Sequence, residues 1–200
     1  MKYIPILVLI VLALLACNLT SRKTNTNAGA STTGGETVQH ANPTNAQLQT
    51  LAGGQTVQWE QQQITWTLPK GWNKMDVDTK QFNYGAPGNK AFLNGSISLL
   101  DASFPTDVSL KAFYDNANTR MKNGEVDDLH WLELDGLKGV EFREASPEHP
   151  DGIRRLQWIA YRKYSGQTQM LNFILSANGK DFPAHQDELY AILYSTKLVH

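Results

Sequence analysis

The pattern of hydrophobic and polar positions predicts strands from about residue 57 of this 200-residue chain onward. Ile64, Trp66 and Leu68 alternate with threonines, as expected for a strand that buries one face. The same alternation predicts strands over residues 92–100, 138–145, 154–164 and 169–177. Residues 74–90, by contrast, are polar and contain Gly and Pro turn signals, so we expect a loop there.

Two segments carry apolar residues at helical spacing. Leu110, Phe113 and Ala117 recur every three or four positions, which predicts a helix over residues 109–123. A closing helix is predicted over residues 184–195 on the same grounds. The solvent side of the first helix carries charged and amide side chains, as an amphipathic helix requires.

The links between the later strands are short enough for hairpins. Asp135-Gly136 follows an apolar pair at Leu132 and Leu134, and Ser165-Gly166 joins the two longest strands. Such links favour an antiparallel sheet over repeated parallel crossovers. We therefore expect an α+β fold in which two helices cover one face of an antiparallel sheet.

The amino-terminal pattern is that of an export signal. An apolar run of about 13 residues ends in Leu14-Leu15-Ala16-Cys17, and a membrane-spanning helix needs roughly 20 residues. The tetrapeptide resembles the lipobox of bacterial lipoproteins, although Leu15 departs from the usual small or β-branched residue. We expect cleavage between Ala16 and Cys17 and lipidation of Cys17, while an ordinary signal peptide is the alternative.

The segment after Cys17 is rich in Asn, Thr, Gly, Ser and Ala and contains no aromatic residue up to residue 50. Such a composition buries too little apolar surface to offset its ordering entropy. The predicted organisation is a signal peptide (1–16), a lipidated amino terminus with a disordered linker (17–50), and one folded domain (51–200).

Charge and cysteine content exclude several function classes. The formal net charge is −1, and no basic surplus is present for nucleic acid or for an anionic membrane surface. Cys17 is the only cysteine, so an intrachain disulfide and a multi-cysteine metal site are both excluded. The chain has no phosphate loop, no nucleophile elbow and no zinc-protease helix. We therefore expect neither enzymatic activity nor a cofactor.

The strongest candidate metal ligands lie at the end of the strand predicted over residues 138–145 and in the loop after it. Glu144, Glu148, His149 and Asp151 combine carboxylates with an imidazole, which would suit a divalent cation. Prolines mark this segment as a loop, where solvated polar residues are common. The pair Asp127–Asp128 is a weaker candidate, and His130 fits a strand-edge histidine better than a catalyst.

The order of several short motifs resembles the PsbP-like fold, which is shared with DcrB-type bacterial lipoproteins and a Ran-binding nuclear-transport factor. The resemblance spans most of residues 58–199. It rests on Leu68-Pro69-Lys70-Gly71-Trp72, the helix beginning near Ser109, Leu134-Asp135-Gly136, the strands over 154–177, Asn178-Gly179-Lys180 and the closing helix. It implies an α/β sandwich and an accessory or binding role.

Two functional hypotheses follow. The first is a membrane-anchored, non-enzymatic lipoprotein of the cell envelope that binds another envelope protein, facing the periplasm from the outer membrane where the host has two membranes. The second is a small-ligand or metal-binding envelope protein with possible hydrolytic activity. A concave pocket with convergent polar groups would favour the second.

Overall fold

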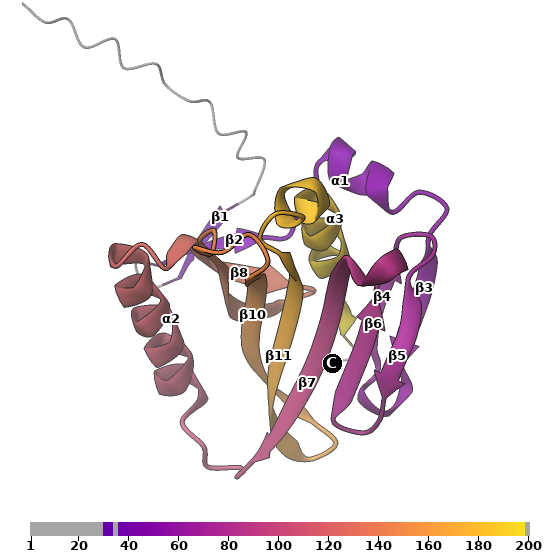
Figure 1. Cartoon of the computed structure of the whole chain (residues 1–200). Helices are drawn as coiled ribbons and strands as arrows, with labels where there is room; N and C mark the ends of the chain where they lie inside the picture. The colour runs from indigo at the N-terminus through magenta and orange to yellow at the C-terminus, as the bar shows by residue number, and fades with distance from the viewer. Residues whose placement is uncertain (1–29, 34–35, 199–200) are drawn as a thin grey trace, which may run out of the picture.

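A computed structural model describes residues 30–33 and 36–198 (Figure 1). Nine strands form one sheet in the order β1-β2-β8-β9-β10-β11-β7-β6-β5, and three form a second sheet in the order β12-β4-β3. The strands are β1 (Ala30–Thr33), β2 (Glu36–His40), β3 (Gln55–Trp59), β4 (Ile64–Leu68), β5 (Asn73–Val77), β6 (Gln81–Gly85), β7 (Ala91–Leu100), β8 (Val126–Leu134), β9 (Leu137–Glu144), β10 (Ile153–Tyr164), β11 (Gln167–Asn178) and β12 (Lys197–Leu198). The helices are α1 (Asn45–Thr50), α2 (Thr106–Lys122) and α3 (Phe182–Tyr194), with short 3-10 turns at Glu60–Gln62 and Pro87–Asn89.

Two hairpins predicted from the sequence are confirmed at the centre of the large sheet. β8 and β9 pair antiparallel around Asp135-Gly136, and β10 and β11 pair around Ser165-Gly166. All four turn residues have positive φ, between 49° and 84°. Two consecutive residues of that kind give a turn whose twist matches the flanking strands.

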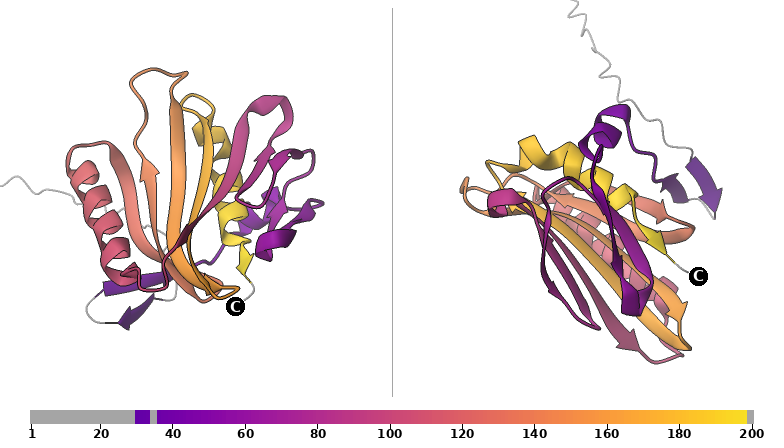
Figure 2. Two further views of the ribbon diagram at one scale, coloured as in Figure 1. Left: turned by 90° about the horizontal axis from the view of Figure 1, so that it is seen from below. Right: turned by 90° about the vertical axis from the view of Figure 1, so that its right-hand side faces the viewer.

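The large sheet buries both of its faces, and β10 shows how. Leu156, Trp158 and Ala160 face α3 and the small sheet, whereas Ile159 and Tyr161 face α2. Because neighbouring strand residues point to opposite faces, these alternating residues belong to two separate apolar clusters. Figure 1 and Figure 2 show α2 and α3 on opposite sides of the large sheet.

The α+β class is confirmed, but the predicted arrangement of two helices on one face is wrong. The helices lie on opposite faces, a third helix is present, and β4 belongs to a separate three-stranded sheet. That small sheet is needed because α3 alone does not cover the face of β11 and β7. Trp66 of β4 fills this space and lies edge-on to Phe173 of β11, with ring centroids 5.2 Å apart.

The predicted linker is also wrong for residues 30–33 and 36–50. β2 pairs with β8, in parallel, through Val38, Gln39 and His40, and Val38 is buried. α1 begins with a capping box in which Thr44 and Gln47 each accept a hydrogen bond from the other's backbone N–H. Backbone pairing and capping therefore order a segment whose side chains are mostly polar.

The loop expected over residues 74–90 contains β5 and β6 instead. β6 pairs with β7, which extends the sheet beyond the predicted strand, and β5 forms its outer edge. Residues 73–76 of β5 are exposed, so the strand lacks the apolar alternation that would have revealed it. The indole of Trp59 donates to the backbone carbonyl of Asp78 at 2.6 Å and so ties the β5–β6 turn to the small sheet.

Candidate functional site

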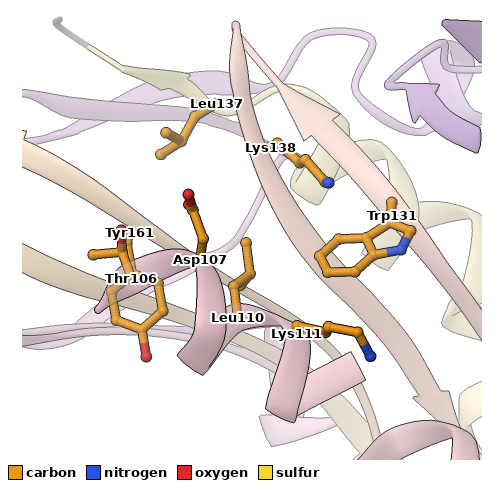
Figure 3. A pocket seen from close by; sticks show the side chains of 8 residues that line it. All are labelled: Thr106, Asp107, Leu110, Lys111, Trp131, Leu137, Lys138 and Tyr161. Carbon is orange, nitrogen blue, oxygen red and sulfur yellow. The ribbon is translucent and has the colours of Figure 1, made fainter. Parts of the chain in front are cut away.

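The side of the sheet under α2 carries a groove of about 470 Å³ (Figure 3). Its apolar wall comes from Leu110, Trp131, Leu137 and Tyr161, and the polar groups around it come from Thr106, Asp107, Lys111 and Lys138. α2 supplies one wall, and β8, β9 and β10 supply the other. The groove exists because α2 packs against this face and no other described element forms a layer beside it.

The Trp131 indole is the centre of the groove. Its ring stacks on Tyr114 at 4.7 Å between centroids and 1° between planes, while the ammonium of Lys138 lies 4.1 Å from the indole centroid. Lys111 forms an ion pair with Asp115, one turn further along α2, at 2.6 Å. Figure 3 shows the indole between Lys111 and Lys138. The stacking on Tyr114 and the contact with the Lys138 ammonium hold the ring in one orientation.

A second hollow continues the groove along the seam between α2 and β8. Its volume is about 420 Å³, and it shares Lys111 and Trp131 with the first. Thr37 and Gln39 of β2 form its far side. The segment expected to be a free linker therefore contributes to the wall of this hollow.

On the opposite face of the same strands, the structure gathers a polar cluster that consists of Asp128, His130 and Glu141. The imidazole Nε2 lies 3.1 Å from Glu141 Oε1, and Nδ1 lies 3.4 Å from Asp128 Oδ1. One ligand atom from each residue falls within 4.8 Å of the other two. It is the one group of three such side chains with this spacing in the described ranges, 30–33 and 36–198.

α3 and two arginines surround this cluster. Tyr190 Oη donates to Asp128 Oδ2 at 3.0 Å and accepts from Arg143 at 3.3 Å. Arg143 and Arg154 both donate to Asp127, next to the cluster. The hydrogen bonds from Tyr190 and the two arginines hold Asp127 and Asp128 in place. His130 lies between Asp128 and Glu141.

The pKa values of Glu141 and His130 are both raised, for different reasons. Glu141 is completely buried, and this desolvation raises the pKa of its carboxyl group. Burial disfavours the charged form of His130 as well, but Glu141 and Asp128 outweigh it and raise the pKa of the imidazole. Glu141 Oε2 is buried and has no hydrogen-bond partner in the structure.

The structure does not bring the predicted metal ligands Glu148, His149 and Asp151 together as a group. All three are exposed, and Asp151 forms an ion pair with Lys180 at 2.5 Å. Glu144 instead pairs with Arg120 at 3.3 Å and with Arg155 at 3.1 Å. Glu148, His149 and Asp151 are therefore exposed loop residues, whereas Glu144 belongs to an ion-pair network with two arginines.

The predicted cleavage and lipidation residues, Ala16 and Cys17, lie outside the described residues. Within the described part of the chain, no helix combines the length and the apolar character that crossing a membrane requires.

Comparisons with known proteins identify the fold. The sequence matches no described protein family and no curated protein. Among solved structures, it is similar to LpqN of Mycobacterium tuberculosis, a protein described as involved in cell envelope biogenesis. The two are 14% identical with a TM-score of 0.51, over 74% of this chain and 86% of LpqN. At this level of identity the likeness shows a shared fold.

Two further structures are similar at lower scores. Cyanobacterial PsbP (CyanoP) from Synechocystis sp. PCC 6803 is 14% identical with a TM-score of 0.47, over 72% of this chain and 92% of CyanoP. A protein from Bacteroides thetaiotaomicron VPI-5482 is 11% identical with a TM-score of 0.44, over 68% of this chain. This chain spans 45% of that protein, which is less than half of its length.

Proposed function

We propose that this chain is a lipid-anchored accessory protein of a bacterial cell envelope, without enzymatic activity, and that it binds a segment of another envelope protein in the α2 groove. The observation that carries the binding role is the difference between the two faces of the large sheet. The apolar core of one face is covered by α3 and the small sheet, while the other face leaves a groove beside a rigidly held indole. Trp131 is 5% exposed, so its indole forms the floor of the groove on which a bound side chain would rest.

The shape of the groove defines the occupant. Leu110, Leu137 and Tyr161 offer an apolar surface, with hydroxyl and charged groups at the rim. A peptide segment with one bulky apolar side chain flanked by polar residues would match this arrangement. The proposed partners do not include nucleic acid, because binding its phosphates needs a surplus of basic residues and the net charge of this chain is −1.

The lipid anchor is supported by the sequence around Cys17. A single acyl chain holds a protein only marginally, whereas two or three chains hold it stably on the membrane. We expect Cys17→Ser to move the protein from the membrane fraction to the soluble fraction. Membrane retention of that variant at the wild-type level would contradict the anchor.

Site-specific photo-cross-linking in cells tests the groove. A cross-linking residue replaces either Asp107, which lines the groove, or Val108, its neighbour, which is 71% exposed and lies outside it. We expect one envelope protein to be captured from position 107 and not from position 108. Equal capture from both positions, or none from position 107, would contradict a groove-bound protein partner.

A small ligand is the second candidate, and the volume of the groove favours it. Sites for small molecules commonly measure about 300–1,000 Å³, and this groove falls in that range. Native mass spectrometry of the protein extracted from cells separates the two candidates. A bound compound that is lost on Leu110→Trp, which fills the groove, would favour the small ligand.

A further inference from the structure

We infer that Asp128, His130 and Glu141 form a binding site for a divalent transition-metal ion of the Zn²⁺ type, on the α3 side of the β8–β9 hairpin. The site lies on the face opposite the α2 groove and does not depend on the function proposed for that groove.

Position in the sheet makes the three residues converge. His130 and Glu141 are directly paired across β8 and β9, and Asp128 lies two residues from His130 on the same face of β8. Cross-strand neighbours of this kind have Cβ atoms about 5 Å apart. The rigid hairpin therefore holds an imidazole nitrogen and two carboxylates within 4.8 Å of one another.

The buried carboxylate provides a second and independent observation. Glu141 is 0% exposed, one of its oxygens contacts His130, and the other oxygen has no hydrogen-bond partner among the residues that the structure describes. A buried carboxylate oxygen without a donor is costly. A cation bound between Glu141 and His130 would satisfy it.

The remaining charges around the cluster leave room for a cation. Among the lysines and arginines of the described residues, Arg143 is the one that pairs with Asp128, at 3.9 Å, and its Nε donates to Asp127 at 2.7 Å. Tyr190 holds one oxygen of Asp128 and leaves the other facing His130. Solvent reaches the cluster at His130 and Asp128, because their side chains are 19% and 31% exposed.

The donor set selects the class of metal. Zn²⁺ binds both imidazole nitrogen and carboxylate oxygen, and three such ligands would leave a fourth position for water. Ca²⁺ prefers six to eight oxygen ligands and would gain little from His130. Ligand atoms around tetrahedral Zn²⁺ lie about 3.4 Å apart. Asp128 and Glu141 now contact different nitrogens of the His130 imidazole, so side-chain rotations that bring both carboxylates to one nitrogen would close the present 4.8 Å arrangement.

Calorimetry on the full chain tests this site. The protein is prepared without a polyhistidine tag, stripped with a chelator and titrated with Zn²⁺ and, separately, with Ca²⁺. We expect one Zn²⁺ per chain, no comparable Ca²⁺ binding, and a rise in Tm with Zn²⁺. Asp128→Asn and His130→Gln should weaken Zn²⁺ binding at least about 100-fold, because even ligand-supporting residues contribute 10–100-fold.

Two variants keep the test decisive. We expect Asp128→Asn to retain the fold, because the Asp128 side chain is partly exposed. This variant therefore tests the site even where replacement of the buried Glu141 prevents folding. The matched control is the double variant Glu148→Gln, His149→Gln, which removes an exposed carboxylate and an imidazole from the nearby loop. Failure of the wild type to bind Zn²⁺, equal binding by Asp128→Asn, or loss of binding in the control would each overturn the site.

Discussion

The two faces of the large sheet differ in how completely they are covered. On the α3 side, Trp66, Trp158 and Phe173 are 0% exposed and pack between two layers. On the α2 side, Ile159 and Leu110 are 4% and 8% exposed, and half-buried aromatic residues surround them. The comparison shows that the side chains under α3 and the small sheet are the more completely buried, whereas the α2 side leaves the groove for which we propose a binding role.

Truncation of one large side chain on each face is the strongest test of this comparison. Phe173→Ala should lower the free energy of unfolding by about 3–5 kcal/mol, because it leaves a cavity among Trp66 and Trp158. Leu110→Ala in the groove should cost about 2 kcal/mol, because water can enter the vacated space. Denaturant unfolding of both variants measures the difference. Equal losses would show that the two faces contribute alike.

Gly139→Ala is expected to have an intermediate effect. A Cβ at this position would lie 2.4 Å from the Trp158 indole nitrogen and 2.6 Å from the backbone oxygen of Ile159. The indole also donates to the carbonyl of Leu132 at 3.1 Å, so its displacement breaks a buried hydrogen bond.

Overpacking of this kind costs about 1–3 kcal/mol, and thermal unfolding would record it. Gly95→Ala is the control, because the nearest atom to its Cβ would be 3.4 Å away. A wild-type Tm for Gly139→Ala would contradict tight packing on the α3 side.

The smallest expected effect belongs to the β5–β6 turn. The backbone N–H groups of Lys80 and Gln81 donate to Asp78 at 2.6 and 2.7 Å, and these bonds lower the pKa of its carboxyl group. A lowered folded-state pKa stabilises the protein above the unfolded value of 3.8 and loses that effect as the pH falls through the folded value. The Tm of Asp78→Ala should therefore be slightly below wild type at neutral pH and converge with it in acid. A constant difference would exclude this cause.

The sequence predicted the parts of the fold in which apolar alternation or turn chemistry determines the structure. The strand at Ile64, Trp66 and Leu68 and the hairpins at Asp135-Gly136 and Ser165-Gly166 are in this group. β2 and β5 were missed because backbone pairing holds them in place while most of their side chains remain polar or exposed. Strands at the edge of a sheet give little periodic signal for this reason.

The polar cluster was missed for a different reason, although a signal for it existed. The sequence presents Asp128 and His130 as two separate weak candidates, and no motif points to Glu141. His130 lies five residues before Asp135, and Glu141 lies five residues after Gly136, so a two-residue turn must place them opposite each other. The α2 groove had no comparable signal, because its shape depends on how α2 packs across three strands.

The placement of β1 and β2 also has a mechanical consequence. The order β1-β2-β8 makes these two strands the outermost layer at one edge of the sheet, and three registered residue pairs join β2 to β8. A pulling force applied at residue 30 would reach this short seam before it reached the long β10–β11 ladder. The pairing between β2 and β8 would then separate first, which would extend the chain under load while the rest of the domain stayed folded.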